Sequence, residues 1–216
     1  MSQVAVLTGG TGRVGAIFLD QLVAAGWRVI TVGRGRASAA SWRHISWDLA
    51  ADPPPEAADL LGQDIGLLIL CAGVECQETA TSLQAEHFRT VMQVNCGGHL
   101  SLLREVAKGH RGQWRVVAVS SDVVSGASPA SLVYSASKAA LEVGVRDAVA
   151  DCRADCDAVI LRLPYLGWPM SSRIGEPGPA ELGPPLRPES LVRLIQSCLA
   201  APFLAGDTRL VAGSPS

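Results

Sequence analysis

Tyr134 and Lys138 are the pair of side chains in this sequence best suited to proton transfer. They lie four residues apart in a segment of helical composition, so a helix would place the phenol and the ammonium one turn apart on the same face. A nearby ammonium favours the phenolate, and we therefore expect it to lower the pKa of Tyr134 toward working pH. A tyrosine tuned in this way is a candidate general acid or base.

A glycine-rich turn near the N-terminus supplies a second signature. Gly9, Gly12 and Gly15 follow a strand-like apolar run and open a helical pattern. The first glycine permits a tight turn, the second lets a pyrophosphate approach the backbone, and the third lets helix and strand pack closely. Phosphates would lie at the helix N-terminus, where free N–H groups favour anions. We expect a nicotinamide dinucleotide, with a sugar nucleotide, a flavin or no ligand as the alternatives.

The residues after the second expected strand bear on the choice between NAD and NADP. An enzyme selective for NAD would place an Asp or Glu there to bind the ribose 2′-hydroxyl. This sequence has Gly33, Arg34, Gly35 and Arg36 instead. Arg34, together with Arg13 or Arg36, would match the 2′-phosphate of NADP. Arginines near a surface turn are ordinarily just solvated, so the missing acid is the stronger reason to expect NADP(H).

Composition indicates one globular domain and gives no sign of a nucleic-acid or membrane partner. The chain has 216 residues, of which 48% are hydrophobic and 18% charged, and its formal net charge is −2. That length fits one domain with a substantial core. The balanced charge offers no attraction to nucleic acid or anionic lipid. With no signal peptide and no apolar run of membrane-spanning length, we expect a cytoplasmic location.

The cysteines and histidines follow no disulfide or metal-binding pattern. The cysteines are Cys71, Cys76, Cys96, Cys152, Cys156 and Cys198, and the histidines are His44, His87, His99 and His110. Cys152 and Cys156 are close together, but no matching pair of histidines or cysteines exists elsewhere. We therefore predict free thiols in a reducing compartment, no metal site and no catalytic histidine.

Short apolar runs alternate with longer helical patterns, which is typical of a parallel sheet covered on both faces. The expected strands are Val4–Thr8, Arg28–Val32, His44–Trp47, Ile65–Cys71, Arg115–Ser120, Ala158–Leu163 and Arg209–Ala212. The expected helices are Arg13–Ala25, Pro55–Leu61, Ala85–Lys108, Leu132–Cys152 and Pro188–Ala200. Right-handed crossovers would give one doubly wound α/β Rossmann domain over residues 1–216 with about seven strands. The ligand crevice should lie outside the carboxyl ends of the strands.

The stretch from Gly167 to Pro188 breaks this alternation. It is rich in Gly and Pro, and apolar periodicity is lost. A segment that covers a substrate and an ordinary surface loop are equally consistent with such a composition.

These features resemble the short-chain dehydrogenase/reductase family over nearly the whole chain. The family's marks appear in its order: Thr8-Gly9-x2-Gly12-x2-Gly15, Asp48-Leu49, Cys71-Ala72-Gly73, Asn95, Ser121, and Tyr134 with Lys138. The resemblance implies a nicotinamide cofactor and hydride exchange with a small ketone, aldehyde or secondary alcohol. It also implies a homodimer or homotetramer, in which the two long helices 85–108 and 132–152 would form the shared face.

The resemblance also implies a role for each matching residue. Tyr134 would exchange the proton with the substrate oxygen, Lys138 would bind the nicotinamide ribose, and Ser121 would orient the carbonyl. Asn95 would hold a helix kink and a water linked to Lys138. Ser120 is the rival of Ser121, because adjacent strand residues face opposite ways. The expected cofactor-binding residues are Thr8, Gly9, Gly12, Arg13, Val14, Gly15, Arg34, Asp48, Leu49, Cys71, Ala72, Gly73, Tyr134, Lys138 and Pro164.

Some positions depart from the family pattern. Cys71 stands where an Asn is common, Pro164-Tyr165 replaces an expected Pro-Gly, and a Thr that often meets the carboxamide is replaced near Pro169. We expect apolar pocket walls from Tyr165, Leu166 and Trp168. Those walls favour an apolar or aromatic substrate. An epimerase or dehydratase with net non-redox chemistry stays open as an alternative, as does a non-catalytic NADP-sensing module.

Overall fold

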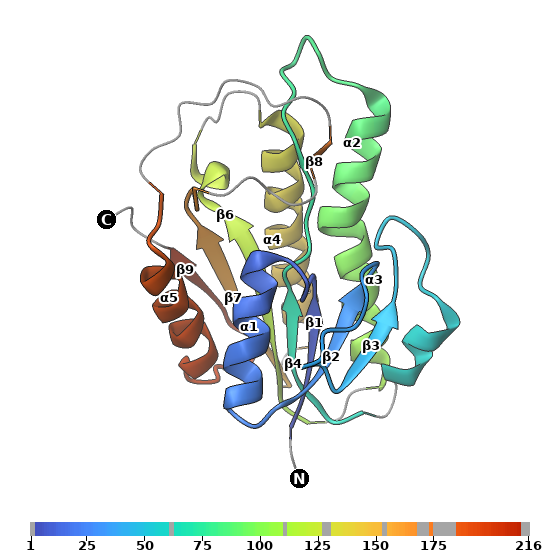
Figure 1. Cartoon of the computed structure of the whole chain (residues 1–216), viewed down its shortest axis with the longest axis vertical. Helices are drawn as coiled ribbons and strands as arrows, with labels where there is room; N and C mark the ends of the chain where they lie inside the picture. Colours follow the sequence, from blue (N-terminus) through green and yellow to red (C-terminus); the bar gives the residue numbers. More distant parts are fainter. Residues whose placement is uncertain are drawn as a thin grey trace.

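A seven-stranded parallel sheet forms the centre of the computed structural model, which describes residues 3–60, 63–109, 112–126, 131–152, 155–167, 173–174 and 185–212 (Figure 1). Its strands are β1 (Val4–Thr8), β2 (Arg28–Gly33), β3 (Arg43–Ser46), β4 (Ile65–Leu70), β6 (Trp114–Ser121), β7 (Cys156–Leu163) and β9 (Thr208–Ala212). The strand order is β3-β2-β1-β4-β6-β7-β9, so the direction of winding reverses between β1 and β4. The predicted α/β class is confirmed, and every sheet strand lies within two residues of its expected bounds.

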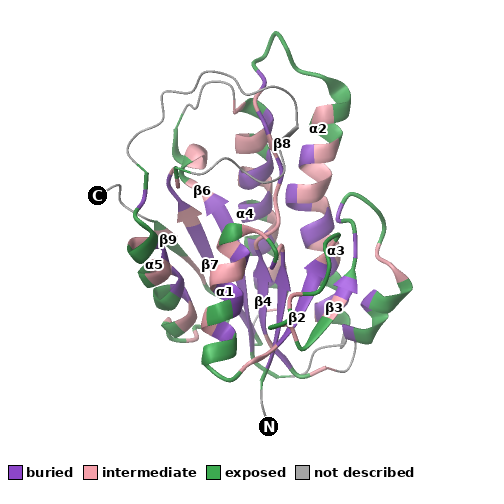
Figure 2. Ribbon diagram, viewed as in Figure 1, coloured by how far each residue is buried: buried purple, intermediate pink, exposed green. Residues whose placement is uncertain are grey.

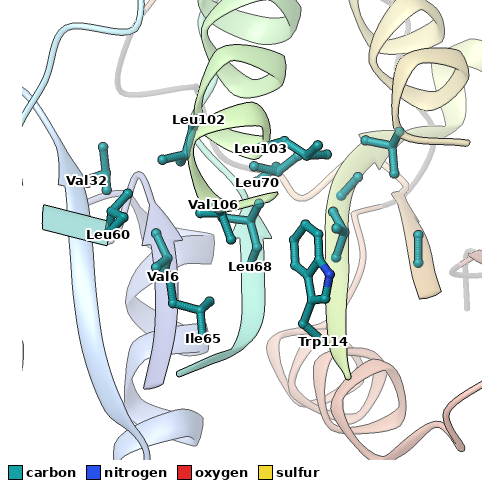
Figure 3. Packing of buried hydrophobic residues seen from close by; sticks show 14 of the residues in the cluster. Val6, Val32, Leu60, Ile65, Leu68, Leu70, Leu102, Leu103, Val106 and Trp114 are labelled. Atoms are coloured by element: carbon teal, nitrogen blue, oxygen red, sulfur yellow. The ribbon is translucent and has the colours of Figure 1, made fainter. Parts of the chain in front are cut away.

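Helices cover both faces of this sheet. They are α1 (Arg13–Ala24), α2 (Ala85–Met92), α3 (Gly98–Gly109), α4 (Leu132–Cys152) and α5 (Pro188–Ala200). Neighbouring strand residues alternate between two buried clusters, because successive side chains of a strand point to opposite faces. Val6 belongs to the same buried cluster as Leu102 of α3 and Leu141 of α4, whereas Leu7 belongs to the cluster that contains Phe18 of α1 and Leu191 of α5. Figure 2 shows the buried strands in purple between the helices, and Figure 3 shows the first cluster, including Val6 and Leu102.

Two predicted helices differ from what the structure shows. The expected helix Ala85–Lys108 is interrupted by a π turn, Gln93–Gly97, which separates α2 from α3. The expected helix Pro55–Leu61 is a short 3-10 helix, Pro55–Leu60, and Leu61 lies outside the described residues. The prolines that precede and begin this segment lack N–H donors, which suits a brief turn better than a long helix.

A second, two-stranded sheet was not predicted. It pairs β5 (Glu75–Cys76) with β8 (Arg173–Ile174) in parallel, and each strand is too short to give a pattern in the sequence. β8 belongs to the Gly/Pro-rich stretch after β7, of which the structure describes only Gly167, residues 173–174 and residues 185–188. Within the described residues, no helix has the length and apolar character needed to cross a membrane.

Candidate active site

The glycine loop turns at the carboxyl end of β1, beside the point where the strand order reverses. Gly9 has a φ of 69°, and a Cβ there would lie 2.8 Å from the Cα of Ala72. A Cβ on Gly15 would lie 2.1 Å from the carbonyl oxygen of Gly9. The N–H of Gly12 donates to that same oxygen at 2.9 Å, which closes the turn before α1. Glycine is required here because any side chain would collide with backbone.

The hydroxyl of Thr8 fixes this loop to neighbouring elements. Its Oγ1 accepts hydrogen bonds from the backbone N–H groups of Cys71 at 2.8 Å and Ala72 at 2.9 Å. Its own proton is then left to donate to Nε2 of His99, 3.1 Å away, and Nδ1 of His99 donates to the carbonyl oxygen of Asn95 at 3.1 Å. Burial lowers the pKa of His99 to about 3, so the ring is neutral with one donor and one acceptor.

Sequence reasoning assigned no role to His99. A signal was present, since His99 lies on the same helical stripe as the buried Cys96 and Leu103, where a polar ring needs hydrogen-bond partners. The hydrogen bonds by which His99 joins the glycine loop to the π turn could be recognised only once the fold was known.

A cavity of about 300 Å³ lies beside the glycine loop. Its lining includes most of the residues that were predicted to bind the cofactor. These are Gly9, Gly12, Arg13, Val14, Gly15, Arg34, Asp48, Leu49, Cys71, Ala72 and Gly73. Four other predicted residues, all within the described part of the chain, are not among its lining: Thr8, Tyr134, Lys138 and Pro164. The cavity is at the small end of ligand pockets.

Both signs of charge border this cavity. Nη1 of Arg34 lies 4.0 Å from Oδ2 of Asp48, and the two side chains are 64% and 45% exposed. Arg13 lines the same space. The end of β2 carries no acidic residue. Asp48, which follows β3, lies next to Arg34, the arginine predicted to bind a 2′-phosphate.

Tyr134, Lys138 and Ser121 come together at the carboxyl end of β6. Lys138 Nζ lies 5.7 Å from the centre of the Tyr134 ring, one turn away on α4 as expected. Ser121, the last residue of β6, forms a hydrogen bond with Tyr134. Lys138 is buried, and its ammonium donates to the carbonyl oxygen of Val119 at 2.9 Å. The structure thus gathers the three side chains that the motifs singled out.

The expected pKa of Tyr134 is wrong in direction. Burial raises the pKa of Tyr134, the carboxylates of Glu75 and Asp122 raise it further, and the hydrogen bond from Ser121 lowers it only in part. Burial also lowers the pKa of Lys138 to about 8. Both shifts have one physical cause, since removal from water disfavours the charged form. The phenol of Tyr134 is therefore protonated near neutral pH, the form that can donate a proton.

The rival serine faces the other way. Ser120 is buried, and its hydroxyl donates to Oε1 of Glu142 at 2.6 Å. That carboxylate is also paired with Arg162 at 2.7 Å. The hydroxyl of Ser121 is instead partly exposed and lies 3.3 Å from Oδ1 of Asp122. The alternation of side chains along β6 places only Ser121 beside Tyr134.

Asn95 lies within the π turn and is fully buried. Its Oδ1 accepts from the N–H of Val74 at 2.8 Å, and its Nδ2 donates to the carbonyl oxygen of Val74 at 2.9 Å and to Ser137 Oγ at 3.0 Å. The side chain therefore joins the loop after β4 to α4, next to Lys138. The irregularity that the resemblance implied at Asn95 is present in the helix.

The far wall of the predicted pocket is only partly described. Trp168 and Pro169 lie outside the described residues. Leu166 lines the cavity, and the carbonyl oxygen of Tyr165 accepts from the N–H of Leu186 at 2.8 Å. This hydrogen bond joins the start of the Gly/Pro-rich stretch to its end.

Comparisons with known proteins agree with the motifs. Residues 56–155 match the family model described as short chain dehydrogenase. The chain is 26% identical over 161 residues to an acetoacetyl-CoA reductase of Allochromatium vinosum, an alignment that spans 65% of this chain and 65% of that protein. It shares its fold with a 3-oxoacyl (acyl-carrier-protein) reductase from Agrobacterium tumefaciens C58 with NADP bound, with a TM-score of 0.75 and 18% identity over 99% of this chain and 94% of the other.

A 4-hydroxyisoleucine dehydrogenase complexed with NADH shares the same fold, with a TM-score of 0.73 and 17% identity over 98% of this chain and 97% of the other. Together with the glycine loop, the sheet order and the Ser-Tyr-Lys arrangement, these matches support the short-chain dehydrogenase/reductase family for this chain. The family binds nicotinamide dinucleotides, and the tight turn that Gly9 and Gly15 permit places the backbone of the glycine loop at the border of the cavity, where such a group would lie.

Proposed function

We propose that this protein is an NADP(H)-dependent reductase that transfers a hydride between the nicotinamide and a ketone, an aldehyde or the corresponding alcohol. The observation that carries this proposal is the meeting of Ser121, Tyr134 and Lys138 beside a glycine loop shaped for a dinucleotide. A sensor that only binds NADP would have no need of this proton-donating arrangement.

In the proposed reaction the cofactor would supply the hydride, and side chains of the protein would donate the proton. Tyr134 donates its proton to the substrate oxygen, while the Ser121 hydroxyl donates a hydrogen bond that orients the carbonyl. Negative charge develops on that oxygen, so two donors and a nearby ammonium stabilise the transition state. The raised pKa of Tyr134 keeps the phenol in its donating form near neutral pH.

The two arginines that border the cavity support NADP(H) over NAD(H). Arg34→Ala should raise the Kd for NADPH by about tenfold, the scale of one lost charge-assisted hydrogen bond, and leave the Kd for NADH nearly unchanged. Arg36→Ala is the matched control, because Arg36 is exposed on the same loop but does not line the cavity. Titration of the protein's fluorescence with each cofactor measures these constants. A wild-type protein that binds NADH as tightly as NADPH would contradict this choice.

For the substrate we propose an apolar ketone, and a 3-oxoacyl thioester as the first class to test. The apolar walls expected from Tyr165 and Leu166, which follow β7, suit an apolar chain better than a charged sugar. The relative from Allochromatium vinosum acts, by its name, on acetoacetyl-CoA, a ketone of this class.

Loss of NADPH absorbance in the presence of a panel of ketones and 3-oxoacyl thioesters tests the activity. With a substrate in hand, Tyr134→Phe should lower kcat by about 10² or more while the Kd for NADPH changes little. Tyr165→Phe is the matched control, since it removes the other phenol of the chain. Equal turnover in Tyr134→Phe and the wild type would refute the mechanism, and a protein that binds NADPH but never oxidises it would favour the sensor.

We also propose that the protein forms a homodimer or homotetramer through α2 and α4. Phe88 on α2 is 43% exposed, and Leu132 and Val143 on α4 are 45% and 51% exposed. Large apolar side chains at such exposure suit a face covered by a second copy. A monomeric mass by light scattering at micromolar concentration would reject this assembly.

A further inference from the structure

Cys76, Glu78 and His87 form a cluster that the proposed reaction does not use. One sulfur, one carboxylate oxygen and one ring nitrogen from these side chains lie within 4.8 Å of one another. Nδ1 of His87 is 2.8 Å from Oε1 of Glu78, and Oε2 of Glu78 accepts the backbone N–H of Gln84 at 3.3 Å. Cys76 and Glu78 are buried, whereas the His87 side chain is 22% exposed.

The spacing of these residues along the chain did not predict this cluster. Cys76 ends β5, Glu78 follows it, and His87 lies in the first turn of α2. The connecting loop brings the helix back over the strand, so three donors that are scattered in the sequence face one another.

The chemistry of the three donors matches a transition metal. Thiolate, imidazole and carboxylate are the ligands that Zn²⁺ prefers in proteins. Bond lengths of about 2.0–2.3 Å in a tetrahedral site put ligand atoms roughly 3.3–3.7 Å apart, so separations within 4.8 Å need only small side-chain shifts. A thiolate and a carboxylate would balance the two charges of the ion, which a buried site requires. We propose that Cys76, Glu78 and His87 bind one Zn²⁺ ion, with a fourth position left for water.

The position of this site indicates a structural role near the reaction end of the crevice. β5 pairs with β8, so that Cys76 lies opposite Ile174 in the stretch after β7. The backbone of Glu78 pairs with Ser131, directly before α4 and one turn from Tyr134. β5 also contacts α2 and α4, and Figure 1 draws β8 beside these helices. An ion at this point would fix β5 to α2 and thereby hold both β8 and the start of α4.

Cobalt and zinc titrations of the whole chain test this site. After removal of metal with a chelator, Co²⁺ should bind once per chain and give the near-ultraviolet thiolate-to-cobalt band together with the visible bands of a tetrahedral ion, and Zn²⁺ should displace it. Saturating Zn²⁺ should raise the Tm by about 5 °C or more, because only the folded chain holds the three ligands together.

Two variants and two controls decide the outcome. Cys76→Ser should remove the thiolate band, and His87→Asn should weaken Zn²⁺ binding by tenfold or more, on the order seen for loss of a metal-site partner. His87 is partly exposed, so His87→Asn should fold even if Cys76→Ser, at a buried position, does not. Cys152→Ser and His44→Asn lie outside the cluster and should bind Co²⁺ as the wild type does. Absence of the thiolate band in the wild type, or unchanged affinity in His87→Asn, would overturn the proposal.

Discussion

The two ends of the candidate active site are built by different means. At the glycine-loop end the shape comes from the main chain: Gly9 adopts a positive φ, and Gly15 has no room for a Cβ. At the reaction end the shape comes from side chains that two distant elements bring together, Ser121 from β6 and Tyr134 with Lys138 from α4. The first end is fixed by a few consecutive residues, whereas the second depends on how the whole sheet packs.

Mutations at the two ends should therefore change different quantities. Alterations at the glycine-loop end should act on cofactor affinity and stability, because they displace backbone that the cofactor would contact. Alterations at the reaction end should act on the rate, because they remove donors needed most in the transition state. The buried ring of His99 joins both ends through Thr8 and Asn95.

The largest expected effect comes from replacing Ser121, the second of two neighbouring serines in β6, by alanine. Ser121→Ala should lower kcat by about 10²–10³, the range for loss of one donor to a developing oxyanion. The Kd for NADPH should stay within a factor of about two, as expected for a donor that acts on the transition state. Steady-state kinetics and cofactor titration measure the two quantities.

Ser120→Ala is the matched control and should show the reverse pattern. It removes the donor to the buried carboxylate of Glu142, so the free energy of unfolding should fall by about 1–3 kcal/mol while kcat stays near the wild-type value. Urea unfolding gives the first number. If Ser120→Ala lowered kcat more than Ser121→Ala, the assignment of the two serines would have to be exchanged.

A somewhat smaller effect is expected at the glycine loop. Gly15→Ala forces a methyl group against the Gly9 carbonyl oxygen. The free energy of unfolding should therefore fall by about 1–3 kcal/mol, and NADPH should bind more weakly. Gly126→Ala is the control, because a Cβ there would meet no atom of the described residues within 4 Å. A Gly15→Ala protein with normal NADPH affinity would show that the loop does not approach the cofactor.

Parts of the molecule governed by local pattern were predictable. β1, α4 and α5 have the bounds that the sequence indicated, since a buried parallel strand is a continuous apolar run and Pro188 suits the first turn of a helix. The choice of Ser121 over Ser120 followed from alternation along one strand and from its distance to Tyr134. That the residues of the glycine-loop cavity would lie together was predictable for the same reason, because most of them lie at strand ends.

Features that depend on contacts between distant segments were not predictable. The π turn at Gln93–Gly97 leaves the apolar periodicity almost unbroken, so one long helix was expected. β5 and β8 are two residues each and find each other only in the folded chain. The pKa of Tyr134 was wrong in direction because spacing shows a nearby ammonium but not the burial that opposes it.

The smallest expected effect is a pH dependence that belongs to the reaction end alone. Burial lowers the pKa of Lys138 to about 8, although Cys71 and Glu142 act in the opposite direction. As the pH rises through this value, the ammonium loses its proton and no longer stabilises the developing negative charge. We therefore expect kcat/KM for reduction to be constant below about pH 8 and to fall by about tenfold per pH unit above it.

The phenol of Tyr134 does not account for such a fall, because burial raises its pKa above the ordinary value and it stays protonated in this range. Lys138→Arg separates the two groups, since a guanidinium keeps its charge throughout. Its kcat/KM should be lower than that of the wild type, yet independent of pH where the wild type declines. A wild-type profile that stays level to about pH 10 would contradict this prediction, because either the pKa of Lys138 would not be lowered or its charge would contribute nothing to the rate.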